Sequence, residues 1–331
     1  MRQDETLGRR RILVTGVGGA PAFDLARELQ RAGHEVIATD ADPLAPGLLI
    51  PGVTPQVTAP SADPRYQQEL LDVCDRLHPD ALFSGVEQEL PLLLGLCPQL
   101  EELKVRAWLA PAGAVAACVD KARFAQVLGE AGVPAPRSWL PDRLHEIHGA
   151  GALIVKPRRG QGSKNVHMCA TPAQATVLCE LVPDPLIQEF VAGQEFTADC
   201  LTGPDGRSSV ILRRRLLVKG GLAMVCETFR HEGAEDAVRR TLTALDMRGV
   251  CCVQGFVRAD AAAVITEANA RFAGAFLASV AAGADLVGQA LRGTFGFEID
   301  HGRLGYRPGV RTTKYVETFT DPGPSAGELE A

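Results

Sequence analysis

Short apolar runs alternate with amphipathic stretches over the first hundred residues. Apolar runs at 11–16, 34–40 and 80–85 are separated by segments whose apolar positions recur with the period of a helix. Strands and helices that alternate at this spacing are typical of a parallel sheet covered by helices. We therefore expect a Rossmann-like domain at 11–112, preceded by a flexible tail at 1–10.

The pattern changes after residue 112. One or two helices are expected there, ending before Pro134 and Pro136, and the glycine-rich RRGQGSKN between two short apolar runs predicts a hairpin with a mobile tip. The later segments predict four strands, an amphipathic helix and a strand pair, in the order PLIQEFV, EFTADCLT, SSVILRRRLLV, AMVCETF, EDAVRRTLTALDM, GVCCVQGFVRAD and AVITEANARF. A final helix is predicted at 275–291 and a disordered tail at 321–331. The fold class is α/β with α+β character.

Composition limits the classes of function. No segment reaches the run of about 18 apolar residues that spans a bilayer, so no membrane partner is expected. The net charge of −6 gives no electrostatic reason to expect a nucleic acid, and a small-molecule ligand fits better. The nine cysteines are scattered without a CxxC spacing and are interpreted as reduced thiols. Since no leader pattern follows the charged start, we expect a cytoplasmic location.

A glycine turn follows the first strand. Gly16, Gly18 and Gly19 precede a predicted helix, and Asp40 closes the second strand, as in a dinucleotide fingerprint. The third glycine of that fingerprint is replaced by Pro21. A tight strand-to-helix turn is therefore favoured over an NAD(P)-dependent oxidoreductase.

The segment ITEANAR carries the most distinctive set of polar residues. Glu267, Asn269 and Arg271 are spaced by two and so share one face of a strand. With Gln254 on the preceding strand, the first two offer hard oxygen ligands of the kind that magnesium prefers, and Arg271 places a positive charge beside them. The alternative is the solvated end of a strand.

Two lysines lie upstream of this set. Lys156 ends an apolar strand and is followed by the loop Gly160 to Ser163, whose backbone N–H groups can converge on phosphate oxygens. Lys121 begins a predicted helix and offers a second cation. Taken singly, either lysine could equally be a solvated surface residue.

In this order the motifs resemble those of the ATP-grasp superfamily, in particular its carbamoyl-phosphate-synthetase-like and biotin-carboxylase-like branch of carboxylate-amine ligases. They are DKARF, VKPRRGQGSKNV, IQEFVAGQEFTAD, VQGFVRAD and ITEANARFAG. The resemblance covers roughly residues 11 to 310 and implies a Rossmann-like domain followed by a two-lobed ATP-grasp module. The small lobe, or lid, would be at 113–187 and the C-terminal lobe at 188–320.

The resemblance also implies roles for individual residues. The residues expected to bind ATP through its phosphates, adenine or ribose are Lys121, Lys156, Gly160, Gly162, Ser163, Gln188, Glu189, Phe190, Val191 and Glu195. The ligands expected for Mg²⁺, with Mn²⁺ as a substitute, are Gln254, Glu267 and Asn269. Arg271 and Lys156 are expected to be catalytic. A glutamine at 254 in place of a carboxylate predicts weaker binding of a second metal ion.

In this superfamily a carboxylate attacks the γ-phosphate of ATP, and an amine or thiol then displaces phosphate from the acyl phosphate. Candidates for binding the carboxylate lie on SSVILRRRLLV and in the turn after it, and are Arg213, Arg215, Lys219 and Gly220. The alternative for them is a basic strand end facing solvent. Glu87 and Glu89 follow a strand of the first domain, where they could hold an amine or simply begin a helix.

We therefore expect an ATP-dependent ligase that forms an amide or peptide-type bond on a small amino-acid-like substrate. A catalytically silent nucleotide-binding protein with the same fold is the main alternative. The pattern does not identify the two substrates, and a homodimer is expected from base rate alone.

Overall fold

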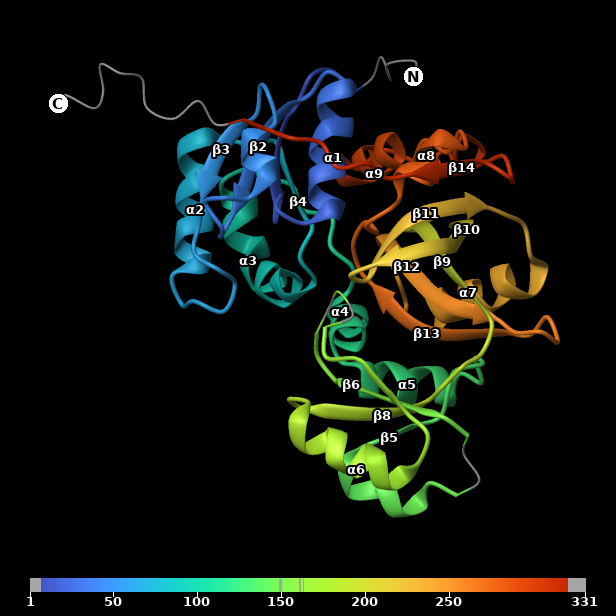
Figure 1. Cartoon of the computed structure of the whole chain (residues 1–331). Helices are drawn as coiled ribbons and strands as arrows, with labels where there is room; N and C mark the ends of the chain where they lie inside the picture. The colour runs from blue at the N-terminus through green and yellow to red at the C-terminus, as the bar shows by residue number, and fades with distance from the viewer. Residues whose placement is uncertain (1–6, 149–150, 161, 163, 321–331) are drawn as a thin grey trace.

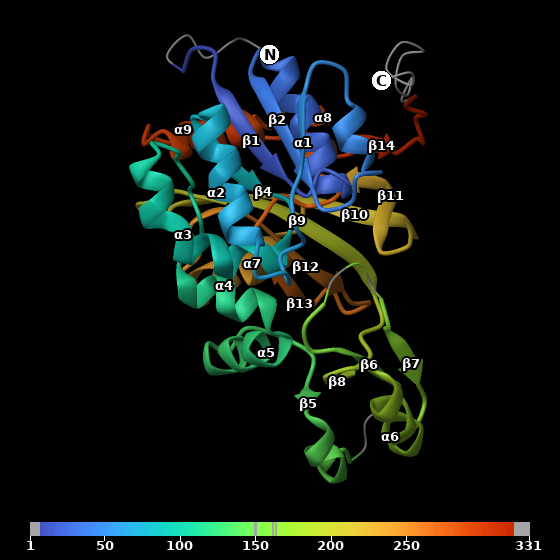
Figure 2. The same cartoon turned by 90° about the vertical axis from the view of Figure 1, so that its left-hand side faces the viewer.

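The computed structural model describes residues 7–148, 151–160, 162 and 164–320. It consists of an N-terminal domain, a small lobe and a large lobe (Figures 1 and 2). Ser163 and the predicted tail at 321–331 lie outside the described residues. The described end of the other predicted tail packs on the domain, with Leu7 buried and Arg10 in an ion pair with Asp80.

The N-terminal domain is built on a parallel sheet, as predicted, and β3 adds a fourth strand to the three that were expected. Its strand order is β3-β2-β1-β4. In chain order its elements are β1 (Arg11–Thr15), α1 (Ala20–Arg31), β2 (Glu35–Asp40), η1 (Pro46–Leu49), β3 (Thr54–Val57), α2 (Tyr66–Leu77), β4 (Ala81–Ser84), η2 (Glu87–Glu89) and α3 (Leu90–Glu102). Gly16, at the turn after β1, has φ +71°, and a Cβ there would lie 2.3 Å from Val86 Cγ2. The turn therefore requires glycine at this position.

The small lobe contains a four-stranded antiparallel sheet of order β5-β8-β6-β7. Its elements are α4 (Ala112–Val119), α5 (Lys121–Glu130), β5 (Ser138–Trp139), η3 (Pro141–Glu146), β6 (Leu153–Pro157), β7 (His167–Cys169), α6 (Pro172–Leu181) and β8 (Pro185–Glu189). The predicted hairpin is β6–β7. Helix α6 was not predicted, although Thr171 caps it by accepting from Gln174 N at 3.3 Å and Pro172 begins it. Strand β8 ends two residues beyond the expected lobe boundary at 187/188.

The large lobe is built on a six-stranded antiparallel sheet of order β13-β12-β9-β10-β11-β14. Its elements are β9 (Gln194–Thr202), β10 (Ser208–Lys219), β11 (Leu222–Thr228), α7 (Glu232–Ala244), β12 (Gly249–Val257), β13 (Ala263–Asn269), α8 (Leu277–Ala281), α9 (Leu286–Thr294), η4 (His301–Leu304) and β14 (Arg311–Thr313). The prediction of a single helix at 275–291 is wrong. Two helices form because Gly283 adopts φ +105° between them, a conformation that ends α8.

Packing joins the N-terminal domain to the large lobe more closely than to the small-lobe sheet. One core combines α2 and α3 with α4, α7 and the large sheet, and a second combines α1 with α8 and α9. The small-lobe sheet and α6 have a separate core, which includes Trp139, Leu153 and Ile187. The small-lobe sheet is thus the part with fewest apolar ties to the rest, and the site lies between it and the joined units. In the described part of the chain, no helix is long and apolar enough to cross a membrane.

Candidate active site

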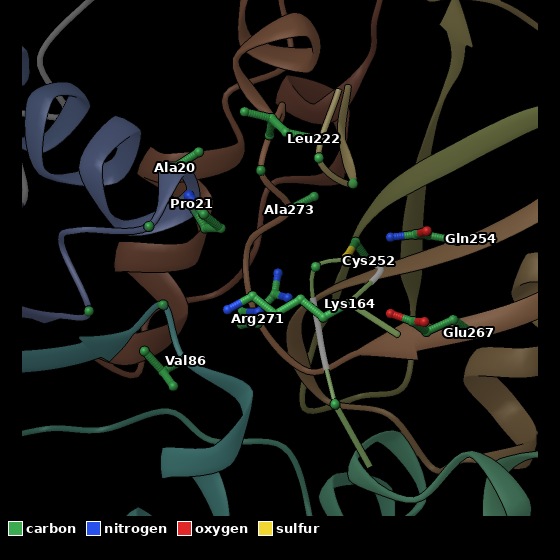
Figure 3. Close-up of a pocket in the computed structure, with 18 of the residues that line it drawn as sticks. Ala20, Pro21, Val86, Lys164, Leu222, Cys252, Gln254, Glu267, Arg271 and Ala273 are labelled. Carbon is green, nitrogen blue, oxygen red and sulfur yellow. The ribbon is translucent and has the colours of Figure 1, made fainter. Parts of the chain in front are cut away.

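A cavity of about 890 Å³ lies where the three units meet. Its walls are the glycine turn after β1, the inner face of the small lobe, and one face of the large sheet (Figure 3). Because adjacent strands present alternate residues to the same face, the large sheet contributes Glu195, Thr197, Arg213, Arg215, Cys252, Gln254, Phe256 and Glu267.

The predicted E-x-N-x-R set lies at the end of β13 and in the turn after it. Gln254 on β12 is directly opposite Glu267, and Figure 3 shows both side chains pointing into the cavity. Asn269 Nδ2 donates to Glu267 Oε1 at 2.9 Å, and Arg271 Nη2 donates to Asn269 Oδ1 at 3.1 Å. Arg271 Nη1 also donates to Phe272 O at 2.8 Å. The three residues therefore form one chain of hydrogen bonds, and Asn269 is buried rather than part of a solvated strand end.

The two lysines converge on the same region from the small lobe. Lys156 Nζ donates to Gln188 Oε1 at 2.8 Å, and Lys121 Nζ donates to Gly160 O at 2.8 Å. Each lysine is only 9% exposed, so neither is a solvated surface residue. Burial lowers the pKa of Lys156 to about 8, with Glu267 opposing that effect and Lys121 adding to it.

Glu267 responds to the same charges. Burial acts to raise the pKa of this carboxyl, but Lys121, Lys156, the hydrogen bond from Asn269 and Arg271 together outweigh it and hold the pKa below its usual value. Glu267 is therefore ionised at neutral pH. Two cations and one carboxylate face each other in the cavity, an arrangement suited to an anionic ligand that brings its own divalent cation.

The loop and hinge residues lie on the small-lobe side of the cavity. Gly160 and Gly162 line it, and Gly162 has φ +69°. The hinge residues Gln188 to Val191 line it as well, and Phe190 is 45% exposed. The carboxylate of Glu189 is bound by Arg137 through Nε at 2.8 Å and Nη2 at 2.5 Å, which lowers its pKa.

Comparison with known proteins gives consistent results for both halves of the chain. Residues 12–107 match the model of the PylC-like N-terminal domain, and residues 182–315 match the model of an ATP-grasp in the biosynthetic pathway with Ter operon. A biotin carboxylase domain of 2-oxoglutarate carboxylase from Hydrogenobacter thermophilus, solved with MgADP, ADP and bicarbonate, superposes with a TM-score of 0.67 at 14% identity, covering 87% of this chain and 70% of that one. An L-amino acid ligase from Bacillus licheniformis superposes with a TM-score of 0.69 at 17% identity, and the match covers 91% of this chain and 78% of the ligase.

This chain has the ATP-grasp fold. A D-alanine–D-alanine ligase from Fusobacterium nucleatum is 28% identical over 90 residues, which is 27% of this chain. That match spans only 30% of the relative's length. Because the structural neighbours are less than 20% identical, they establish the fold and leave the reaction open.

The residues predicted to bind the carboxylate substrate lie in different surroundings. Arg213 is 2% exposed, and it donates to both carboxylate oxygens of Asp199, at 2.9 and 3.2 Å. Arg215 is paired with Glu195 and its side chain is 7% exposed, so the solvent-facing alternative is wrong for both arginines. Gly220 lines the cavity, whereas Lys219 is exposed and does not.

Glu87 comes from η2 of the N-terminal domain and is 5% exposed. Its Oε1 accepts from Ala270 N at 3.1 Å, and its Oε2 lies 3.5 Å from Arg271 Nε. Glu87 Oε2 and Arg271 Nε are both buried, and neither has a hydrogen-bond partner among the described residues. Burial raises the pKa of Glu87 to about 7, although Arg271 opposes the shift. Glu87 therefore contacts Arg271 and does not line the open cavity.

The sequence offered Glu89, on the N-terminal wall of the cavity, as a possible amine ligand, and Glu89 does line the cavity. Asp40 Oδ2 accepts from Gly18 N at 2.6 Å, and both residues line the cavity with Glu89. Glu89 is held by Ser84 Oγ at 2.6 Å and by Thr15. Gly18 and Asp40 were recognised as a possible dinucleotide turn, but only tertiary packing brings that turn to the ATP-grasp cavity.

Proposed function

We propose that this protein binds Mg-ATP and uses the γ-phosphate to activate a small carboxylate as an acyl phosphate, which an amine then attacks. The observation that carries this proposal is the convergence of Lys121, Lys156 and Arg271 on Glu267 in one cavity. Phosphoryl transfer to a carboxylate needs positioning and charge neutralisation more than it needs a general base. This constellation supplies both.

The donor set fits a hard divalent cation. Glu267 is an ionised carboxylate, and its Oε2 has no hydrogen-bond donor among the described residues. Asn269 holds Oε1 and so fixes the orientation of the carboxylate. Glu267 would therefore hold Mg²⁺, with Asn269 beside it, and the ion when bound would neutralise charge on the phosphates. The complex of the Hydrogenobacter neighbour with MgADP supports this choice of cofactors.

The roles of the remaining residues follow from their positions. Lys121 and Lys156 would bind phosphate oxygens, and Arg271 would stabilise charge on the transferred phosphoryl group. A carboxylate oxygen of the substrate forms a bond to the γ-phosphorus, and the bond to the bridging oxygen of ADP breaks. The amine nitrogen then bonds to the carbonyl carbon, phosphate leaves, and the amine proton passes to solvent.

A screen of ADP release tests the proposal. Carboxylates and amines are supplied in pairs to the whole protein with Mg-ATP, and products are identified by mass spectrometry. ADP and phosphate should form only when an acceptor carboxylate is present. The named ligase neighbours make amino acids the first compounds to try. A broad screen without ADP release would contradict the proposal and favour a catalytically silent nucleotide-binding protein.

Variants then test the assignment of residues. Arg271→Ala should lower kcat by about a hundredfold or more while ATP still binds, because the arginine acts on charge that develops during transfer. Arg214→Ala is the matched control, since Arg214 pairs with Glu227 at 3.4 Å and does not line the cavity. Near-normal turnover in Arg271→Ala would show the mechanism to be wrong.

A further inference from the structure

The guanidinium of Arg215 joins two parts of the proposed nucleotide site. It pairs with Glu195 on β9, donates through Nη1 to Gln254 Oε1 on β12 at 3.1 Å, and donates through Nη2 to Gly221 O at 2.6 Å. A guanidinium has five N–H donors. Among the described residues these three acceptors leave two N–H groups of Arg215 for a ligand. Arg215 is thus a fixed cation in the cavity wall that can still bind an anion.

Gln254 is poorly suited to hold a metal ion while Arg215 remains in this position. Its side-chain oxygen is uncharged and already accepts a hydrogen bond from a cation. A divalent ion on the same oxygen would lie within a few ångströms of the guanidinium, where like charges repel. Asn269 Oδ1 is likewise engaged by Arg271 at 3.1 Å.

Glu267 differs from these two amides. It is the one carboxylate among the three predicted ligands, and it stands directly opposite Gln254 in the β12–β13 register. Among the described residues it forms no ion pair with an arginine. Affinity for a divalent cation rises with the number of charged ligands, so one carboxylate supports one ion much better than two.

Resting on the function proposed above, we propose that the site takes one divalent cation, anchored at Glu267, and that Arg215 takes the place of a second one. The guanidinium supplies positive charge and two N–H donors to the phosphates of the nucleotide. It cannot be released or exchanged as a metal ion can, so it positions the phosphates whether or not the metal concentration is high. Gln254 serves to hold the guanidinium.

The number of bound ions tests this proposal without reference to turnover. The protein is dialysed to equilibrium against Mn²⁺ with a saturating non-hydrolysable ATP analogue, and bound Mn²⁺ and analogue are measured per chain. The wild type should hold one Mn²⁺ per bound analogue. The double variant Arg215→Met with Gln254→Glu should hold two, since a second carboxylate replaces the amide and the guanidinium is removed.

Three further variants keep the charge at residue 215 and should each retain one ion. Arg215→Lys preserves the cation, Gln254→Glu alone leaves the new carboxylate paired with Arg215, and Arg214→Met changes a neighbouring arginine outside the cavity. If the wild type binds the analogue normally but holds two Mn²⁺ per analogue, this inference is overturned and the proposed function is not. A wild type that binds no analogue would overturn the proposed function and this inference together. Should the double variant not fold, the wild-type count still decides between one ion and two.

Discussion

The buried ammonium of Lys156 should make ATP binding depend on pH. Burial lowers its pKa to about 8, so the group loses its proton only slightly above neutral pH. ATP phosphates favour the charged form, and their binding therefore raises the pKa of Lys156 again. Above pH 8, binding must then take up a proton, and affinity falls as pH rises.

The size of the change in ATP affinity follows from the pKa of Lys156. With a pKa of about 8, roughly one free protein in eleven carries the charged lysine at pH 9. The apparent Kd for ATP should therefore rise about eightfold between pH 7.5 and pH 9, or about 1.3 kcal/mol, and by roughly a further factor of ten per pH unit above that.

The assay is a titration with a fluorescent ATP analogue between pH 7.5 and pH 9.5, with proton uptake checked by calorimetry in two buffers of different ionisation enthalpy. Lys156→Arg is the matched control, because a guanidinium stays charged over this range and should bind ATP with a flat pH dependence. Lys156→Met should bind weakly at every pH. An unchanged Kd in the wild type from pH 7.5 to 9.5, or the same slope in Lys156→Arg, would refute the reasoning.

Three further predictions concern stability, measured as the free energy of unfolding in urea. Glu87 has a pKa of about 7 in the folded state, against an ordinary value of 4.5, so the folded state binds more protons than the unfolded state between these two values. The wild type should therefore lose about 3 kcal/mol of stability as pH rises through this range. The difference in stability between the wild type and Glu87→Gln should therefore change by the same amount over this pH range. A difference that stays constant with pH would contradict the prediction. Arg213→Met should lower the free energy of unfolding by about 3–5 kcal/mol, because the carboxylate of Asp199 is then left buried without its cation. A loss below 1 kcal/mol would show that the pair is dispensable. Gly293→Ala should lower the free energy of unfolding by about 1–3 kcal/mol, since the new Cβ would lie 1.8 Å from the Trp108 ring. Gly95→Ala is the control and should be neutral or stabilising, because a Cβ there would have no atom within 4 Å. Equal effects of the two substitutions would contradict the packing argument.

The central site could be predicted from the sequence because it depends on local geometry. Glu267 and Asn269 share a face through the two-residue period of a strand, and a short turn after β12 brings Gln254 opposite Glu267. Lys156 was placed at the end of a strand by the same reasoning. Such relations extend over a few residues and are determined by backbone periodicity and turn length.

Other features depend on how distant elements pack. Glu87 contacts the segment of Arg271 across 183 positions of the chain, and the pairing of Arg215 with Gln254 spans 39. The break between α8 and α9 depends on the backbone of Gly283, which a helical pattern of apolar residues conceals.

The sequence by itself therefore determined the order of the domains, most strands and several polar residues that line the candidate site. Tertiary structure alone decided which cation lies beside which acceptor. The physical reason is that hydrophobic burial sets how the N-terminal domain and the large lobe dock, and it is largely non-directional. The partners of a charged side chain such as Glu87 or Arg215 are consequently known only once that docking is known.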